Sequence, residues 1–477
     1  MTKQEAAIKY ITENYLDYRR LRHDIVADKL QVRLLGDEAK GKRQEYWKEL
    51  SKHDINSIVC HCAQEYDANI TSREVMTALQ SDLIPDVHPL REYILSLQPY
   101  TPDQPDWIDW VASQVRVKNN DNIDNLRPNR TRSDRSNACE VRIPLGAQGE
   151  YSSPRQDVDC RGMLSKLSSN NNSSLTSNNN HSLSSPNNPA DRLWRGCFKK
   201  WFVAMVASWM KDEVVNHQVL VLIGKQGIFK TTWLEHLIPP HLRAYACKLA
   251  NSNDLNKDER LRIAEFGLIS MDEIDSMNNR ELNQLKSVIT ATDVNERAAY
   301  AYTKERRVRL ASFCASGNRR DFLTDITGNR RWLPFEVESI QNPFYTILPY
   351  ERMYAQAWAL AQDPLFSYWF DLDEIEVLEQ HNQYFRDESN EEQLLPILFD
   401  VPAEGRGEFM TTAQISERLV TYGNIKKPMA LGRLGVLMSS MGYRSVQRQI
   451  GCRRGRGWIV YQRDTDEIAS MRRLLIH

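Results

Sequence analysis

The sequence lacks the features of a membrane or secreted protein. It contains no apolar run long enough to span a bilayer, and its first residues have no apolar core of the kind that a signal peptide needs. Its 8 cysteines are scattered, and the one close pair, Cys60 and Cys62, does not have the spacing of a zinc knuckle. We therefore expect free thiols in a reducing cytoplasm, with no membrane partner and no disulfide framework.

The chain also lacks an excess of charge of either sign. It has 62 lysines and arginines against 63 aspartates and glutamates, which gives a formal net charge of -1. A chain that is basic as a whole is thereby excluded, and any contact with nucleic acid has to come from local patches. The length of 477 residues predicts two to four domains, and a hydrophobic content of 41% is ordinary for a globular protein.

Changes in periodicity divide the sequence into four segments. Residues 1–117 have helical apolar spacing and are predicted to be a mostly helical domain. Residues 118–189 become rich in serine and asparagine, so we expect a disordered linker that cannot bury enough apolar surface to fold. Residues 190–390 alternate strands with helices, and residues 391–477 are separate again.

The alternation in the third segment predicts an α/β domain. Strands connected by helices favour a mostly parallel sheet with helices on both of its faces. The apolar runs that predict these strands are residues 219–223, 266–271, 308–315 and 332–337.

The most informative segment runs from Val219 to Leu237. A β-branched apolar strand is followed by a glycine-containing turn, then by Lys230-Thr231-Thr232 and a helix-compatible sequence. This order is typical of a phosphate-binding P-loop, in which backbone N–H groups face the anion, a lysine neutralises the outer phosphates and a threonine hydroxyl binds magnesium. The sequence therefore predicts a nucleotide site with ATP and Mg²⁺ as its cofactors.

One residue departs from the P-loop pattern. The pattern has glycine directly before its lysine, and this chain has Phe229 there. Glycine avoids crowding near the α-phosphate, but Gly224 and Gly227 remain, so the turn can still form if Phe229 has a negative φ. Nucleotide binding is expected on this basis, whereas the rate of hydrolysis stays open.

Polar residues that suit nucleotide hydrolysis follow the next strands. Asp272 and Glu273 end one strand, where the first carboxylate would hold Mg²⁺ and the second would polarise the attacking water. Acidic residues often follow strands, but this pair comes in the order that a hydrolase requires. Asn318 either contacts the γ-phosphate and water or caps a turn. Arg330 and Arg331 either stabilise a transferring phosphoryl group, in cis or from a neighbouring subunit, or form a solvated turn.

Two basic stretches are candidates for DNA contact. The first combines cations with tyrosines, which suits a phosphate backbone and stacked bases or equally a solvent-facing hairpin. The second lies in the C-terminal segment, where two helices and a hairpin predict a winged helix whose basic wing contacts either DNA or another protein. The candidate residues are Lys286, Arg297, Tyr300, Arg306 and Arg307 in the first stretch and Arg453, Arg454 and Arg456 in the wing.

Several of these motifs together resemble the virulence-associated E family. They are the P-loop, the strand end Met271-Asp272-Glu273, the triplet Ser316-Gly317-Asn318 and the run from Thr327 to Pro334, which is the most specific of them. The resemblance covers about residues 80–365, interrupted by the linker. It implies a P-loop ATPase of bacteria, phages and mobile elements with an AAA+-like core. Such proteins are similar to superfamily-three and primase-associated helicases, which work as ring-shaped oligomers.

The same resemblance implies roles for individual residues. Lys230 would contact the β- and γ-phosphates, Thr231 and Asp272 would bind Mg²⁺, and Asn318 would be the first sensor. The implied nucleotide-binding residues are Gly224, Gln226, Gly227, Lys230, Thr231 and Thr232. The implied catalytic residues are Asp272, Glu273, Asn318, and the finger or second sensor Arg330 or Arg331. More loosely, the place of a DNA-contacting hairpin in superfamily-three helicases is taken by Lys286, Arg297 and Tyr300.

We therefore expect an ATP-dependent DNA helicase or translocase that replicates a phage or mobile element in a bacterial cytoplasm. Its expected partners are single-stranded or forked DNA and further copies of the chain, with a hexameric ring as one form. Two alternatives remain: a nucleotide-binding regulatory or defence ATPase that oligomerises without unwinding DNA, and a DNA-binding adaptor with a degenerate P-loop. The acidic pair and Asn318 argue against the adaptor, and DNA-stimulated ATPase activity would separate the other two.

Overall fold

In the computed structural model the chain forms two compact units. The first comprises Met1–Asn318 and Arg331–His381, and the second comprises Arg319–Arg330 and Asn382–His477. The structure describes residues 2–16, 20–34, 46–66, 69–119, 188–249, 257–296, 305–323, 329–402, 407–450 and 453–475. The predicted linker at 118–189 lies almost wholly outside these ranges.

The N-terminal part of the first unit contains helices, as predicted, and also a sheet that the sequence did not predict. Its helices α1 (Lys3–Ile11), α2 (Lys52–Tyr66) and α3 (Ser72–Leu79) share a core with a four-stranded sheet. The strands are β1 (Leu21–Asp24), β2 (Lys29–Leu34), β3 (Tyr46–Glu49) and β4 (Asp86–Val87). Strand β2 alternates polar and apolar residues with a period of two, which is a strand pattern and not a helical one.

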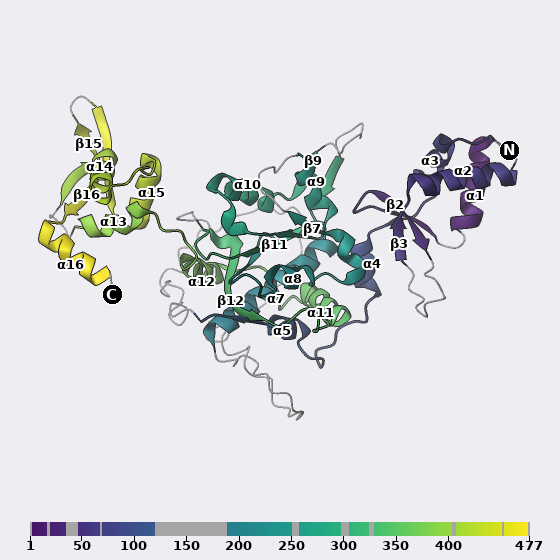
Figure 1. Cartoon of the computed structure of the whole chain (residues 1–477), viewed down its shortest axis with the longest axis horizontal. Coiled ribbons are helices and arrows are strands. Elements are labelled where there is room, and N and C mark those ends of the chain that lie inside the picture. Colours follow the sequence, from purple (N-terminus) through teal and green to yellow (C-terminus); the bar gives the residue numbers. More distant parts are fainter. Residues whose placement is uncertain are drawn as a thin grey trace, which may run out of the picture. The chain divides into compact units, whose positions relative to one another are not determined.

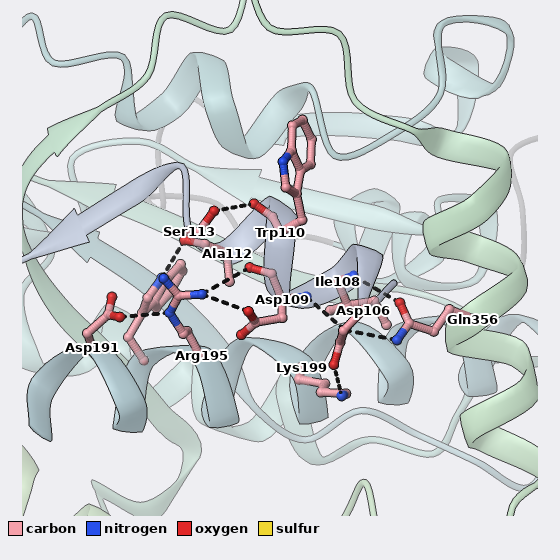
Figure 2. Close-up of polar contacts among 11 residues, drawn as sticks. Asp106, Ile108, Asp109, Trp110, Ala112, Ser113, Asp191, Arg195, Lys199 and Gln356 are labelled. Atoms are coloured by element: carbon pink, nitrogen blue, oxygen red, sulfur yellow. Dashed lines mark hydrogen bonds and ion pairs between the residues drawn. The ribbon is translucent and has the colours of Figure 1, made fainter. Parts of the chain in front are cut away.

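Residues 89–117 pack into the same core as the long helix α7 (Pro189–Met210), although the sequence placed them in an N-terminal domain. They form α4 (Pro89–Ser96), α5 (Trp107–Ala112) and β5 (Val115–Val117). Figure 2 shows how α5 is attached to α7: Arg195 Nη1 lies 2.7 Å from Asp109 Oδ2, and Lys199 pairs with Asp106. Gln356 Nε2 also donates to Asp106 Oδ1 at 2.9 Å. These contacts fix β5 at the edge of the central sheet.

The central sheet has the strand order β5-β12-β6-β11-β8-β7 and lies in the middle part of the chain (Figure 1). Strands β12, β6, β11, β8 and β7 are parallel, and β5 is antiparallel to β12. Every residue of β6 is buried, as its continuous apolar run requires in a parallel sheet. The predicted mixed α/β fold with a mostly parallel sheet is therefore confirmed. The strands are β6 (Val219–Ile223), β7 (Ala246–Leu249), β8 (Leu268–Met271), β11 (Ser312–Gly317) and β12 (Trp332–Ile340).

Helices and a hairpin connect these strands. The connecting helices are α8 (Lys230–Glu235), α9 (Lys257–Glu265) and α10 (Asn279–Thr290), whereas α11 (Tyr350–Gln362) and α12 (Leu372–Gln383) follow the last strand, β12. The hairpin pairs β9 (Asp293–Glu296) with β10 (Glu305–Val308). The single strand predicted at residues 308–315 is thus two strands, because the fully buried Arg309 separates β10 from β11.

The C-terminal part of the second unit has the predicted order of two helices followed by a hairpin. Helices α14 (Thr412–Gly423) and α15 (Leu431–Ser440) precede β15 (Arg444–Ile450) and β16 (Arg453–Gln462), which pair antiparallel. Trp458 and Val460 of β16 share the apolar core with both helices, which attaches the hairpin to them. The remaining elements are α13 (Asn390–Leu398), β13 (Phe399–Asp400), β14 (Glu408–Thr411) and α16 (Thr465–Leu475).

Candidate functional site

The predicted phosphate loop leaves the carboxyl end of β6. Gly224 follows the strand, and a Cβ atom at this position would lie 2.7 Å from the Val337 carbonyl oxygen on β12, so a larger residue does not fit. Gly227 has φ 86°, which favours glycine. The loop ends at Lys230, the first residue of α8. Because β6 lies between β11 and β12, the loop emerges at the middle of the sheet edge.

Phe229 takes a left-handed conformation with φ 67°, so the turn forms without the negative φ that the sequence reasoning required. The loop needs at this position the backbone turn that glycine ordinarily provides, and phenylalanine adopts it at a cost on the order of 1 kcal/mol. The ring of Phe229 meets that of Phe344 nearly at right angles, with centroids 6.4 Å apart. Phe229 therefore occupies a backbone conformation that favours glycine, the residue that the P-loop pattern has at this position.

The Lys230 ammonium group is buried inside the loop. Its Nζ donates to the carbonyl oxygens of Gly224 and Lys225, both at 2.7 Å, and lies 3.3 Å from Asn318 Oδ1. Burial lowers the pKa of Lys230, and the carboxylates of Asp272 and Asp275 oppose that shift. The structure thus brings together Lys230 and Asn318, which lie 88 residues apart in sequence.

A second cluster joins Thr231 to the acidic strand end. Thr231 Oγ1 lies 3.1 Å from Asp272 Oδ1 and 2.8 Å from Ser316 Oγ, and Ser316 Oγ donates to the same carboxylate oxygen at 2.6 Å. Burial by itself raises the pKa of Asp272, but hydrogen bonds from Ser316, Lys248 and Thr231 outweigh it and hold this pKa below its usual value. Asp272 is therefore ionised at neutral pH.

The donor set of this cluster fits Mg²⁺. Thr231 supplies a hydroxyl oxygen and Asp272 a carboxylate oxygen, which are hard ligands of the kind that magnesium prefers. Within the described ranges no group of three or more His, Cys, Asp or Glu side chains could hold a metal ion. A magnesium ion here would take its other ligands from water and phosphate, as is usual for this ion in nucleotide sites.

Sequence reasoning missed three residues of the site. Lys248 on β7 forms an ion pair with Asp272 at 3.0 Å, and the pKa of Lys248 is raised by this contact. Asp275 Oδ1 accepts a hydrogen bond from the Asn318 N–H at 3.0 Å. Ser316 was present in the recognised triplet but had no assigned role. Asp275 could have been suspected because it follows the acidic pair, whereas an edge-strand lysine such as Lys248 has no distinctive sequence pattern.

The remaining predicted residues of the nucleotide site differ in where the structure places them. Glu273 is exposed and left-handed, with φ 52°. Gln226 is exposed in the loop, and Thr232 lies in the first turn of α8. Arg331 directly precedes Trp332, which pairs with Val219 at the opposite, amino-terminal edge of the sheet. That edge is roughly 15 Å from the loop, so the structure does not bring Arg331 to the site of its own chain. Arg330 belongs to the second unit.

The predicted DNA-contacting residues fall on three elements. Lys286 is half-buried on α10, and Arg306 and Arg307 lie on β10. Arg307 already pairs with Asp28 at 2.7 Å and with Glu265 at 3.7 Å, so much of its charge is neutralised within the chain. Arg297 and Tyr300 lie outside the described residues.

The basic wing is present as a hairpin. Arg453, Arg454 and Arg456 lie on β16, and Arg456 is exposed and donates to Ser445 Oγ at 3.0 Å. The wing therefore has an exposed arginine, and its contact with DNA stays a prediction.

Among the helices that the structure describes, none combines the length and the apolar character needed to cross a membrane.

Comparison with solved structures gives weak matches. An apo structure of the C-terminal region of NrS-1 has 10% sequence identity and a TM-score of 0.39, with 96% of this chain and 100% of that chain covered. A second apo form of the same region has 11% identity and a TM-score of 0.38, with coverage of 94% and 98%. These values are too low to transfer any property of NrS-1 to this chain. No curated protein gave a significant match.

A protein-family comparison is more informative. The model of the virulence-associated protein E-like domain matches residues 171–392, which include the loop, the acidic pair and Asn318. The resemblance seen in the sequence started at about residue 80, whereas this match starts at residue 171. Residues 80–170 therefore lie outside the matched domain. The chain therefore carries a virulence-associated protein E-like domain at residues 171–392.

Proposed function

We propose that this chain binds ATP with Mg²⁺ at the carboxyl edge of the central sheet and hydrolyses it, coupling hydrolysis to movement along DNA during replication of a phage or mobile element. The observation that carries the proposal is the convergence of Lys230, Thr231, Asp272 and Asn318 from three neighbouring parallel strands and their loops. A basic group, a hydroxyl, a carboxylate and an amide at one sheet edge are the parts that phosphoryl transfer needs.

Each side chain has a task that its position supports. Lys230 would give its positive charge to the outer phosphates, and Thr231 with Asp272 would hold Mg²⁺, which neutralises phosphate charge when bound. Glu273 would take a proton from the attacking water, since it follows Asp272 and is exposed. Asn318, fixed by Asp275 through its backbone N–H, would orient that water or the γ-phosphate.

The order of the strands supports an AAA+-like P-loop core. The loop follows β6, Asn318 follows the neighbouring strand β11, and the acidic pair follows β8 one strand farther out. In such a core the paired arginines would act on a neighbouring copy of the chain. The position of Arg331 at the opposite sheet edge is consistent with that use, and a ring-shaped homo-oligomer follows as part of the proposal.

Two hairpins are the proposed DNA contacts. The first is β9–β10, and the second is the wing β15–β16 with its exposed Arg456. Phosphate contacts of this kind weaken as salt rises because bound counterions are released when they form. DNA affinity that falls steeply with salt, and falls further in Arg456→Gln, would support the wing contact.

The proposed function is tested by the ATPase rate with and without single-stranded DNA. We expect wild-type hydrolysis that DNA accelerates, and a rate at least about 100-fold lower in Glu273→Gln, since a positioned general base contributes about that much. ATP binding without DNA-stimulated hydrolysis would instead favour the nucleotide-binding regulatory or defence module. A Glu273→Gln rate equal to wild type would remove Glu273 from the proposed chemistry.

A further inference from the structure

An exposed aromatic side chain lies directly beside the phosphate loop. Strand β12 passes Gly224, continues to Ile340 and turns near the carboxyl edge of the sheet. In the following turn Phe344 meets the ring of Phe229 at 6.4 Å and the ring of His236 at 5.5 Å, both nearly at right angles. Despite these two contacts, Phe344 remains 68% exposed.

The turn that carries Phe344 is held in place. The Phe344 N–H donates to Asn342 Oδ1 at 3.0 Å, which closes the turn. Farther along, the hydroxyls of Tyr350 and Tyr354 donate to the carbonyl oxygens of His236 and Leu237, at 2.7 and 3.0 Å. The segment is thus tied at its far end to the residues that follow α8. An aromatic surface fixed beside the loop is pre-organised for a planar ligand.

We propose that Phe344 is the surface on which the nucleobase stacks when its phosphates are bound at the loop. The inference rests on the proposed ATP site and adds the residue that holds the other end of the nucleotide. Phe229, one residue before Lys230, links the phosphate loop to Phe344 through the ring contact. A large exposed apolar side chain next to a polar anion site suits a ligand with one flat and one anionic end.

The chemistry of this surface also predicts its selectivity. Neither Phe344 nor Phe229 has a side-chain group that can form hydrogen bonds, and stacking on an aromatic ring tolerates any base because every base has a π-face. The stacking contact by itself therefore does not distinguish ATP from GTP. Truncation of the ring should weaken nucleotide binding about tenfold, the range measured for single base–aromatic stacks.

The same turn offers a matched control. Tyr345 and Ile347 are also exposed, at 87% and 86%. The ring contacts with Phe229 and His236 are made by Phe344 and not by Tyr345, and Ile347 has no aromatic ring. If this face instead covered a second copy of the chain, loss of Tyr345 or Ile347 would lower the mass of the assembly and leave nucleotide affinity of the monomer unchanged. Stacking therefore predicts weaker nucleotide binding on loss of Phe344, whereas an interface between copies predicts a smaller assembly on loss of Tyr345 or Ile347.

Calorimetry with ATP and with inorganic tripolyphosphate, both in Mg²⁺, tests the inference. We expect Phe344→Ala to weaken ATP about tenfold and leave tripolyphosphate unchanged, Phe344→Tyr to restore ATP binding, and Tyr345→Ala to bind both as wild type does. Equal weakening of both ligands by Phe344→Ala, or of neither, would overturn the stacking role while leaving the phosphate site intact. Failure of wild type to bind either ligand would overturn the proposed function and this inference with it.

Discussion

The substitution Arg309→Met should destabilise the first unit at the base of the β9–β10 hairpin. Arg309 is fully buried and follows β10, while the residues before β9 form the end of α10. Its guanidinium group donates to carbonyl oxygens on both sides of the hairpin and to one in the segment that precedes β6. These acceptors are Asn216, Val288, Ile289, Ala291 and Ala311. Three of them come from the carboxyl end of α10, where the helix dipole favours a cation.

The magnitude follows from the acceptors that would be left behind. Burial lowers the pKa of Arg309 to about 9, which still leaves the group charged at pH 7. Methionine fills similar space but cannot donate to the carbonyls of Asn216, Ala291 and Ala311, which lie 2.9, 3.2 and 3.1 Å from guanidinium nitrogens. A buried acceptor without its donor costs about 1–3 kcal/mol, and removal of a desolvated charge offsets part of the sum. We expect a net loss of about 3 kcal/mol.

Urea unfolding and peptide-level hydrogen exchange would measure this loss. Arg309→Met should unfold at lower urea and exchange faster across residues 279–296, with Arg280→Met as the control because Arg280 is an exposed arginine on the same helix. Wild-type stability and protection in Arg309→Met would refute the reasoning that this side chain fixes the hairpin to the sheet. Equal effects of the two variants would refute it as well.

Three further predictions concern other features of the fold and the site. Phe229→Gly should be more stable than Phe229→Ala by about 1 kcal/mol in thermal unfolding, since only glycine relieves the left-handed φ; a more stable alanine variant would contradict the strain. Lys248→Met should reduce the Mg²⁺ concentration needed for ATP binding roughly fivefold, because Lys248 competes for Asp272 and an exposed ion pair is worth up to about 1 kcal/mol; a higher requirement would oppose this. Burial lowers the pKa of His381 to about 4, so this side chain is protonated at a lower pH in the folded state than in the unfolded state. Stability should fall as pH drops from about 6.5 to 4, and the melting temperature of His381→Gln should fall less steeply; equal slopes would contradict it.

The convergence of the side chains of the proposed nucleotide site was largely predictable because its signals are local in sequence. The loop, Lys230, Thr231, Asp272 and Asn318 each follow an apolar strand, and parallel strands of one sheet bring such positions to the same edge. Short runs of strand, turn and polar residue carry this information without any knowledge of distant contacts. The hairpin of the C-terminal unit was predictable for the same reason, since Trp458 and its neighbours alternate toward the helices.

What escaped prediction depends on contacts between distant segments. Lys248 reaches the site only because β7 pairs with β8, and the buried Arg309 interrupts what reads as one strand. The N-terminal strands are short, and neighbouring helical patterns concealed their alternation. A negative φ was required of Phe229 from its residue type alone, whereas the loop geometry gives it a left-handed φ. Tertiary context overrides local preference in each of these cases.

ATP binding by calorimetry, with wild type compared with Lys230→Ala in Mg²⁺, tests the central claim most directly. Lys230 is the cation at the centre of the loop, and its removal leaves the carbonyls of Gly224 and Lys225 without a donor. The account predicts measurable binding to wild type that weakens at least about tenfold in Lys230→Ala, as expected for a lost charge-assisted contact. A wild-type protein that does not bind ATP, or a variant that binds it equally well, would contradict the nucleotide site.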